Sequence, residues 1–245
     1  MTSSSGTVMR IGWVVDVQRD FMEPDGRLYV RDLGDASDPG ATSIVATLGD
    51  AVAWMRENCA VIVYTGDWHA LDDDEIDPHA PKPQAGTYPP HCMGRSDDPD
   101  ERAGAELMEV VRPTDPLVLP IGATGAEAAA TAREAIRRGR SVFIQKNRFD
   151  VFEGNAAAET FVATLADEVE GQMELVVIGV ARDVCVTQAV DGMQDRGYRI
   201  TAVRDATWGL GLEDEEVTLG RWASRGSVVT LSELTGQPRR AGVPS

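Results

Sequence analysis

Three residues of this sequence could together activate a nucleophile, and each follows a short apolar run. They are Asp16, Lys146 and Cys185. A carboxylate can accept the proton of a thiol, and a nearby cation can stabilise the charges that form. Each residue also has a purely structural interpretation. Asp16 is a common turn residue, Lys146 can end an exposed strand, and Cys185 can pack as a small apolar side chain.

A second group has the residue types of a metal site. Asp67 and His69 are two positions apart after an apolar run, and all three histidines of the chain lie between residues 69 and 91. Histidine is the commonest ligand for transition metals, so Asp67, His69 and His91 form a plausible ligand set. His79 is either a fourth ligand or a solvated side chain. The acidic run at 72–75 is interpreted as a solvated face, because it lacks the spacing of a calcium loop.

The elements that must position these residues alternate along the chain. Short apolar runs predict buried strands, and apolar residues at helical spacing predict helices between them. This alternation predicts an α/β fold with a doubly wound, mostly parallel sheet and helices on both faces. We expect strands at 8–15, 60–65, 141–145, 176–180, 198–203 and 227–231, and helices at 44–57, 123–138, 156–168, 186–196 and 213–225.

The topology implies that the two groups form one site. Asp16, Asp67, Lys146 and Cys185 each follow a different predicted strand, and parallel strands place their carboxyl ends at one edge of the sheet. Cys185 would also lie where a strand passes into a helix. The N–H groups and partial positive charge of a helix N-terminus favour a thiolate there.

The sequence predicts one domain from 8 to 235, with flexible tails at 1–7 and 236–245. No repeats or interdomain linker are apparent. Residues 70–105 are rich in proline and acidic residues and lack apolar periodicity. A long irregular segment inside a compact domain is usually functional or disordered.

Composition narrows the classes of function and location. The formal charge is −17, from 23 basic and 40 acidic residues. Such a surface repels phosphate backbones and anionic lipids, so we expect neither nucleic-acid nor membrane binding. Three cysteines argue against a disulfide scaffold and for a reducing compartment. Residues 1–10 lack an apolar signal core, so the expected location is cytoplasmic.

Six motif positions carry a family resemblance across residues 8–205. They are Asp16 in VVDVQRDF, Asp67 and His69 in DWH, His91 in PPHC, Lys146 in QKNRFDVF and Cys185 in GVARDVCV. In these motifs the sequence resembles the isochorismatase-like cysteine hydrolases. The DWH and PPHC motifs are similar to those of the metal-binding nicotinamidase branch.

The resemblance implies a catalytic triad and an oxyanion site. The triad would be Asp16, Lys146 and Cys185. A cis peptide bond between Val180 and Ala181 would direct the Ala181 N–H, with that of Cys185, toward a developing oxyanion. The implied reaction converts nicotinamide to nicotinate and ammonia through a cysteine thioester, as a step of NAD salvage.

The resemblance also implies a cofactor and a substrate site. One divalent transition metal ion, zinc first and otherwise iron or manganese, would bind Asp67, His69 and His91, with His79 as an additional ligand. Phe21 and Tyr88 would flank an aromatic substrate ring. The expected partner is a small amide molecule. Relatives of this fold are often oligomeric, so a homo-oligomer is compatible with the sequence, although no interface can be identified in it.

Several other functions compete with this one. A related cysteine amidohydrolase would act on another small amide, such as a maleamate-like or N-carbamoyl substrate, and Arg182 beside the nucleophile would favour a carboxylated one. An enol-ether hydrolase of the isochorismatase type would share the aspartate and lysine but lack the cysteine, so Cys185 argues against it. A non-catalytic binding module on this fold is the third alternative. It predicts an ordinary thiol titration for Cys185.

Overall fold

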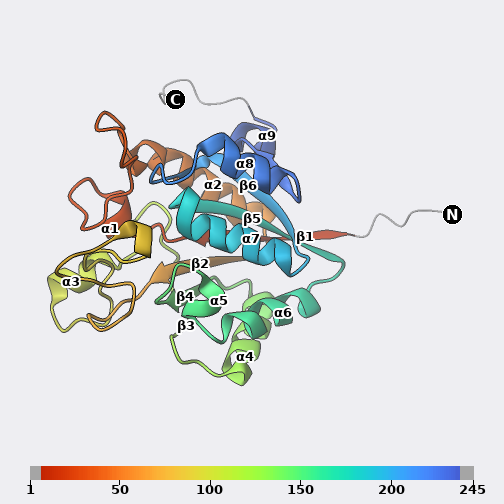
Figure 1. The fold of residues 1–245 in the computed structure, drawn as a ribbon. Helices are drawn as coiled ribbons and strands as arrows, with labels where there is room; N and C mark the ends of the chain where they lie inside the picture. Colours follow the sequence, from red (N-terminus) through yellow and green to blue (C-terminus); the bar gives the residue numbers. More distant parts are fainter. Residues whose placement is uncertain (1–6, 238–245) are drawn as a thin grey trace.

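A central parallel sheet organises the molecule. The computed structural model describes residues 7–237, and in them seven strands pair side by side in the order β3-β4-β2-β1-β5-β6-β7 (Figure 1). Every pairing between neighbouring strands is parallel. The strands are β1 (Val8–Val15), β2 (Val61–Asp67), β3 (Leu117–Leu119), β4 (Val142–Lys146), β5 (Gln172–Val180), β6 (Arg199–Trp208) and β7 (Ser227–Val229).

The sheet is buried because successive side chains enter two different cores. In β2, Val61 and Val63 belong to one core, whereas Ile62 and Tyr64 belong to the other. Side chains of a strand alternate between its two faces, so a strand covered on both faces must be apolar throughout. This requirement explains why the central strands are continuous apolar runs rather than alternating ones.

Helices cover both faces of the sheet (Figure 1). One core contains residues of α4, α6, α7 and α8, and the other contains residues of α1, α2, α9 and the short turn η1. The helical elements are α1 (Arg19–Met22), η1 (Ala41–Ile44), α2 (Val45–Asn58), η2 (Pro83–Ala85), α3 (Pro99–Gly104), α4 (Gly125–Arg138), α5 (Val151–Gly154), α6 (Ala158–Glu168), η3 (Arg182–Val186), α7 (Thr187–Asp195), α8 (Glu215–Ala223) and α9 (Leu231–Thr235).

The predicted α/β architecture is confirmed, with differences at the periphery. β3, with only three residues at the sheet edge, was not predicted from the sequence. The strand predicted at 198–203 is longer in the structure, where β6 continues to Trp208. The predicted strand 227–231 is shorter, because Thr230 caps α9 and ends β7 at Val229. Of the predicted tails, residues 1–6 and 238–245 lie outside the described residues.

The irregular segment 70–105 is tied to the body of the protein by local contacts. Ile76 pairs with Tyr88 in an isolated bridge, and His69 N–H donates to the Cys92 carbonyl at 3.0 Å. The segment therefore folds back on itself and returns to the end of β2.

No helix within residues 7–237 is long and apolar enough to cross a membrane.

Candidate active site

The carboxyl edge of the sheet gathers the predicted reactive residues. Asp67 and Lys146 are the last residues of β2 and β4, Asp16 follows β1, and Cys185 lies in the π-helical turn η3 after β5. These four strands are consecutive neighbours in the sheet. The sulfur of Cys185 and carboxylate oxygens of Asp16 and Asp67 lie within 4.8 Å of one another. The expected convergence at one edge is confirmed.

Asp16 is buried and held in an unusual backbone conformation. Its φ angle is 51°, in the left-handed region that residues other than glycine seldom adopt. The hydroxyl of Thr65 donates to one carboxylate oxygen at 2.7 Å, and Lys146 Nζ lies 2.8 Å from the other. Backbone strain of this kind persists only where surrounding contacts enforce it, and it is common at functional sites.

A glycine allows β5 to approach β1 just before the nucleophile turn. Gly179 has a φ of 129°, and a Cβ atom there would lie 2.0 Å from the carbonyl oxygen of Val15. A side chain at this position is therefore excluded. The peptide bond between Val180 and Ala181, one residue further along, is cis, as the resemblance implied.

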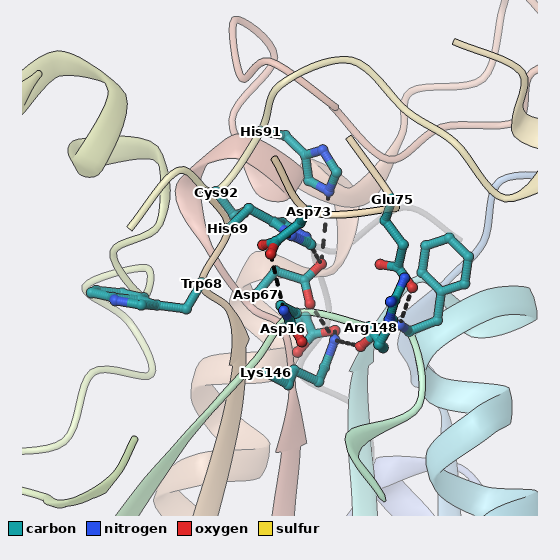
Figure 2. Close-up of polar contacts among 12 residues, drawn as sticks. Asp16, Asp67, Trp68, His69, Asp73, Glu75, His91, Cys92, Lys146 and Arg148 are labelled. Atoms are coloured by element: carbon teal, nitrogen blue, oxygen red, sulfur yellow. Dashed lines mark hydrogen bonds and ion pairs between the residues drawn. The ribbon is translucent and has the colours of Figure 1, made fainter. Parts of the chain in front are cut away.

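Lys146 connects two carboxylates inside the protein. Its ammonium lies between Asp16 and Asp67 and also donates to the Arg148 carbonyl at 3.1 Å (Figure 2). Burial alone would lower the pKa of Lys146, but the charges of Asp16 and Asp67 raise this pKa well above its usual range. Lys146 is therefore a permanent cation. At Asp67 the charge of Lys146, together with the contacts to His69 and His91, outweighs burial and holds the pKa well below the ordinary value.

At Cys185 and Asp16, burial outweighs the effect of the Lys146 charge. Burial raises the pKa of the Cys185 thiol well above its usual range, although Lys146 opposes the rise. Burial also raises the pKa of Asp16 against the effect of Lys146. Cys185 lies in η3, between β5 and α7, so the predicted strand-to-helix junction is confirmed. Burial opposes ionisation of its thiol, and the charge of Lys146 favours it.

Asp67, His69 and His91 form a compact group of metal-ligand type. One oxygen of Asp67 lies 3.6 Å from His69 Nε2 and 3.7 Å from His91 Nε2, and the ligand atoms of the three residues fall within 4.8 Å of one another. All three side chains are buried. Two imidazole nitrogens and a carboxylate are donors that suit zinc and related transition metals.

The histidine ring nitrogens support this interpretation. The Nδ1 atom of His91 is 2.7 Å from the Pro89 carbonyl, and that of His69 is 3.2 Å from an oxygen of Asp73. Each outer contact is to an acceptor and places a proton on Nδ1, so Nε2 is the nitrogen with which the neutral ring can bind a cation. His69 Nε2 is buried without a hydrogen-bond partner. The group thus fits a bound cation.

Gln18 fixes the backbone of Asp67 and has no signal in the sequence pattern. Its side-chain oxygen accepts from the Asp67 N–H at 2.8 Å, and its amide nitrogen donates to the Asp67 carbonyl at 2.8 Å. The amide also donates to the Ala105 carbonyl at 2.8 Å. Gln18 therefore joins the chain after β1 to the end of β2.

The acidic run at 72–75 contains two residues of the site, so its interpretation as a solvated face is wrong in part. Glu75 is buried, and one of its oxygens accepts the Phe149 N–H at 2.8 Å while the other has no partner. Burial, together with the negative charge of Asp67, raises the pKa of Glu75 to about 7. Asp73 contacts His69 (Figure 2). Their proximity in sequence to His69 was the available signal.

Two other expectations are corrected. His79 is exposed and lies outside the Asp67, His69 and His91 group, because its own backbone N–H bonds the Asp77 side chain in a surface turn. Arg182 is buried but already engaged. It donates to the hydroxyl and carbonyl of Thr207 at 3.0 and 2.9 Å and pairs with Glu215 at 2.6 Å.

A cavity opens onto Cys185 and the histidine group. Its wall is largely aliphatic and aromatic, and Phe21 and Tyr88 both belong to it, as expected. Phe149, which the sequence analysis did not single out, completes an aromatic side and meets Tyr88 edge-on at 5.5 Å between ring centroids. The lining residues are Phe21, Leu28, Val30, Asp67, Tyr88, His91, Phe149, Ala181, Val184, Cys185 and Leu210.

Comparisons with known proteins agree with this geometry. Residues 13–233 match the model of the isochorismatase domain family. A comparison with curated protein sequences gives no significant match.

Solved structures with the same fold include several hydrolases. A pyrazinamidase of Pyrococcus horikoshii, determined in complex with zinc, is 25% identical; the alignment covers 91% of this chain and 99% of that one, with a TM-score of 0.60. A pyrazinamidase/nicotinamidase of Streptococcus mutans is 18% identical, covering 90% and 99%, with a TM-score of 0.61. An N-carbamoylsarcosine amidase of Thermoplasma acidophilum is 21% identical, covering 91% and 96%, with a TM-score of 0.59.

The family match spans most of the chain, and the seven-stranded parallel sheet carries its reactive groups on one edge. The chain belongs to the isochorismatase domain family.

Proposed function

We propose that this protein hydrolyses the carboxamide of nicotinamide to nicotinate and ammonia, with one divalent transition metal ion, zinc first, as cofactor. One observation carries the proposal. Lys146 bonds both Asp16, beside Cys185, and Asp67, beside the two histidines, so a nucleophilic centre and a cation site share one buried lysine. Both groups contribute residues to the same apolar cavity.

Acylation begins with the Cys185 thiol. Asp16 takes the thiol proton as the sulfur attacks the carboxamide carbon, and Lys146 stabilises the negative charge of the site. The N–H groups of Ala181 and Cys185 are assigned to the oxyanion, each contributing a few kcal/mol to the stability of the transition state. Asp16 then protonates the leaving nitrogen, the carbon–nitrogen bond breaks, and ammonia departs from a Cys185 thioester.

Deacylation uses the same groups in reverse. Asp16 accepts a proton from a water molecule as the water oxygen attacks the thioester carbon. Asp16 then returns the proton to the departing sulfur of Cys185. The products are the carboxylic acid and the regenerated thiol. A cation held by Asp67, His69 and His91 would supply a Lewis acid that binds the ring nitrogen of the substrate.

The cavity favours a neutral aromatic amide over a carboxylated one. Phe21, Tyr88 and Phe149 provide ring surfaces, and none of the residues that line this cavity is lysine or arginine. Arg182, the candidate for binding a substrate carboxylate, is held by Thr207 and Glu215. A maleamate-like or N-carbamoyl substrate would thus place its carboxylate in largely apolar surroundings with no lysine or arginine among the lining residues to pair with it, which is costly.

Ammonia release tests this function. Zinc-loaded protein is assayed with nicotinamide, benzamide, maleamate and N-carbamoylsarcosine, and Cys185→Ala protein is the matched control. We expect nicotinamide to be the best substrate and the control to be inactive. Benzamide lacks the ring nitrogen and should react more slowly. Faster release from a carboxylated amide, or no release from nicotinamide by folded, zinc-loaded protein, would overturn the proposal.

A further inference from the structure

Asp73 makes polar contacts with four other residues beside the metal-ligand group. One of its oxygens is 3.2 Å from His69 Nδ1 and accepts the Ala70 N–H at 3.0 Å. The same oxygen bonds the Arg95 guanidinium. The other oxygen accepts from the Asn147 side-chain amide at 3.0 Å. Asp73 is thus held from separate parts of the chain.

These contacts fix the orientation of the His69 ring. A carboxylate can only accept, so the His69 nitrogen facing Asp73 must carry its proton. The other nitrogen, Nε2, is the atom left to bind a cation; it is buried, has no hydrogen-bond partner and lies 3.6 Å from an Asp67 oxygen. The contact with Asp73 thereby presents Nε2 of the ring to the centre of the group.

The two histidines differ in this outer contact. The Nδ1 atom of His91 faces a neutral acceptor, the Pro89 carbonyl, whereas that of His69 faces the Asp73 carboxylate. A carboxylate behind a metal-bound imidazole raises its basicity more strongly than a neutral group does. With Asp73 in this position, we expect His69 to bind a cation more strongly than His91 does.

The surroundings of Asp73 hold its carboxylate in place. The Ala70 N–H, the Arg95 guanidinium and the Asn147 side-chain amide all donate to it. Arg95 is itself fixed, because its Nε donates to the Trp68 carbonyl at 2.9 Å and its backbone N–H to the His69 carbonyl at 3.1 Å.

Asn147 extends the network toward the nucleophile. It directly follows Lys146, so the contact from its side chain to Asp73 joins the end of β4 to the histidine group. Figure 2 shows Asp73 beside His69, with Asp67 and Lys146 next to them. The carboxylate therefore lies between the segment that supplies a metal ligand and the segment that supplies the triad cation.

We propose that Asp73 is the positioning residue of the metal centre: by holding Nδ1 of His69 it sets the tautomer and basicity of that ligand, and hence the affinity for the divalent ion. The inference rests on the metal site of the proposed function. It does not depend on which amide is hydrolysed.

The affinity for zinc, measured without substrate, tests the role of Asp73. Zinc dissociation constants of wild type, Asp73→Asn and Asp73→Ala are determined by competition with a chromogenic chelator. Removing an outer-shell partner of a metal ligand typically weakens binding 10–100-fold. We expect a loss of about 10- to 100-fold in both variants. Asp72→Asn is the matched control, because it removes the same charge at the neighbouring, exposed position. Its affinity should stay within about 2-fold of wild type.

Two further measurements separate positioning from general damage. Thermal unfolding of the metal-free variants reports stability without the ion, and the absorption spectrum of the cobalt-loaded proteins reports ligand geometry. Positioning predicts a changed cobalt spectrum, and a melting temperature that drops more in the zinc-loaded than in the metal-free variants.

Each outcome decides between explanations. Zinc affinity of Asp73→Asn and Asp73→Ala within about 2-fold of wild type would overturn the proposal. An equal loss in Asp72→Asn would also overturn it, since it would show a nonspecific charge effect. Wild type that binds no zinc would overturn both this inference and the proposed cofactor, while ammonia release by metal-free protein would keep the proposed substrate. Conversely, a zinc-binding protein that fails to hydrolyse nicotinamide would leave the Asp73 result intact.

Discussion

Lys146 donates a hydrogen bond to a carboxylate oxygen of Asp67, and this contact joins the nucleophilic centre to the metal-ligand group. The other oxygen of Asp67 faces His69 and His91, at 3.6 and 3.7 Å from their Nε2 atoms. One carboxylate therefore serves two centres. A substitution in the nucleophilic centre is therefore expected to affect the metal-ligand group, and a substitution in the metal-ligand group to affect the nucleophilic centre.

Removing the lysine cation should move the acid limb of the activity profile. Asp16 must be ionised to accept the thiol proton; burial raises its pKa, and Lys146 lowers it. In Lys146→Met the pKa of Asp16 rises, so the acid limb of kcat/KM shifts to higher pH, and kcat falls by about 10²–10⁴-fold. Lys82→Met, an exposed lysine in the segment 70–105, is the control. An unshifted acid limb in an active Lys146→Met enzyme would contradict the role of Asp16 as the base.

The two histidines of the segment 70–105 should differ in their effect on metal binding. His91 is buried next to Asp67, and His79 is exposed. We expect His91→Ala to lose its metal on dialysis, because one of three ligands is gone, whereas His79→Ala keeps about one ion per chain. Elemental analysis of the dialysed proteins gives the stoichiometry. Loss of metal from His79→Ala would restore His79 to the ligand set.

Glu75 should make the metal-free protein less stable as the pH rises. Its folded pKa of about 7 lies above the reference value of 4.5, so the folded state binds the extra proton between these pH values. The free energy of unfolding therefore falls as pH rises through this window, by about 3 kcal/mol, and is unaffected below it.

Glu75→Gln removes this titration and keeps an oxygen for the Phe149 N–H. Urea unfolding of chelator-treated protein should show Glu75→Gln more stable than wild type at pH 8, and equally stable near pH 4.5. A constant difference across this range would show that Glu75 is not buried as a neutral acid.

Arg182 should act on stability rather than on substrate choice. Arg182→Met removes two hydrogen bonds to Thr207 and the ion pair with Glu215, which together should lower the free energy of unfolding by about 2–4 kcal/mol. Arg204→Met is a matched control, because Arg204 also pairs with Glu215 but is 39% exposed, and its loss should cost less than about 1 kcal/mol. Denaturant unfolding measures both values, and an equal loss of unfolding free energy in Arg182→Met and Arg204→Met would contradict this prediction.

The sequence by itself determined the sheet and the edge on which the chemistry lies. Continuous apolar runs predict strands buried on both faces, and parallel strands leave their carboxyl ends together, so Asp16, Asp67, Lys146 and Cys185 could be placed before any coordinates. The local sequence pattern did not predict a short strand that forms only by pairing with its neighbour. β3 has three residues and exists because β4 lies beside it.

Only the tertiary structure decided which polar residues reach the site. His79 and Glu75 belong to the same irregular segment, and nothing in their spacing shows that Glu75 is buried while His79 faces solvent. Gln18, Asp73 and Arg182 depend on partners 4 to 87 positions away along the chain. Such contacts follow from how loops pack against the sheet edge. Residue type and spacing therefore suggest the chemistry, whereas burial and hydrogen-bond partners determine which side chains can take part in it.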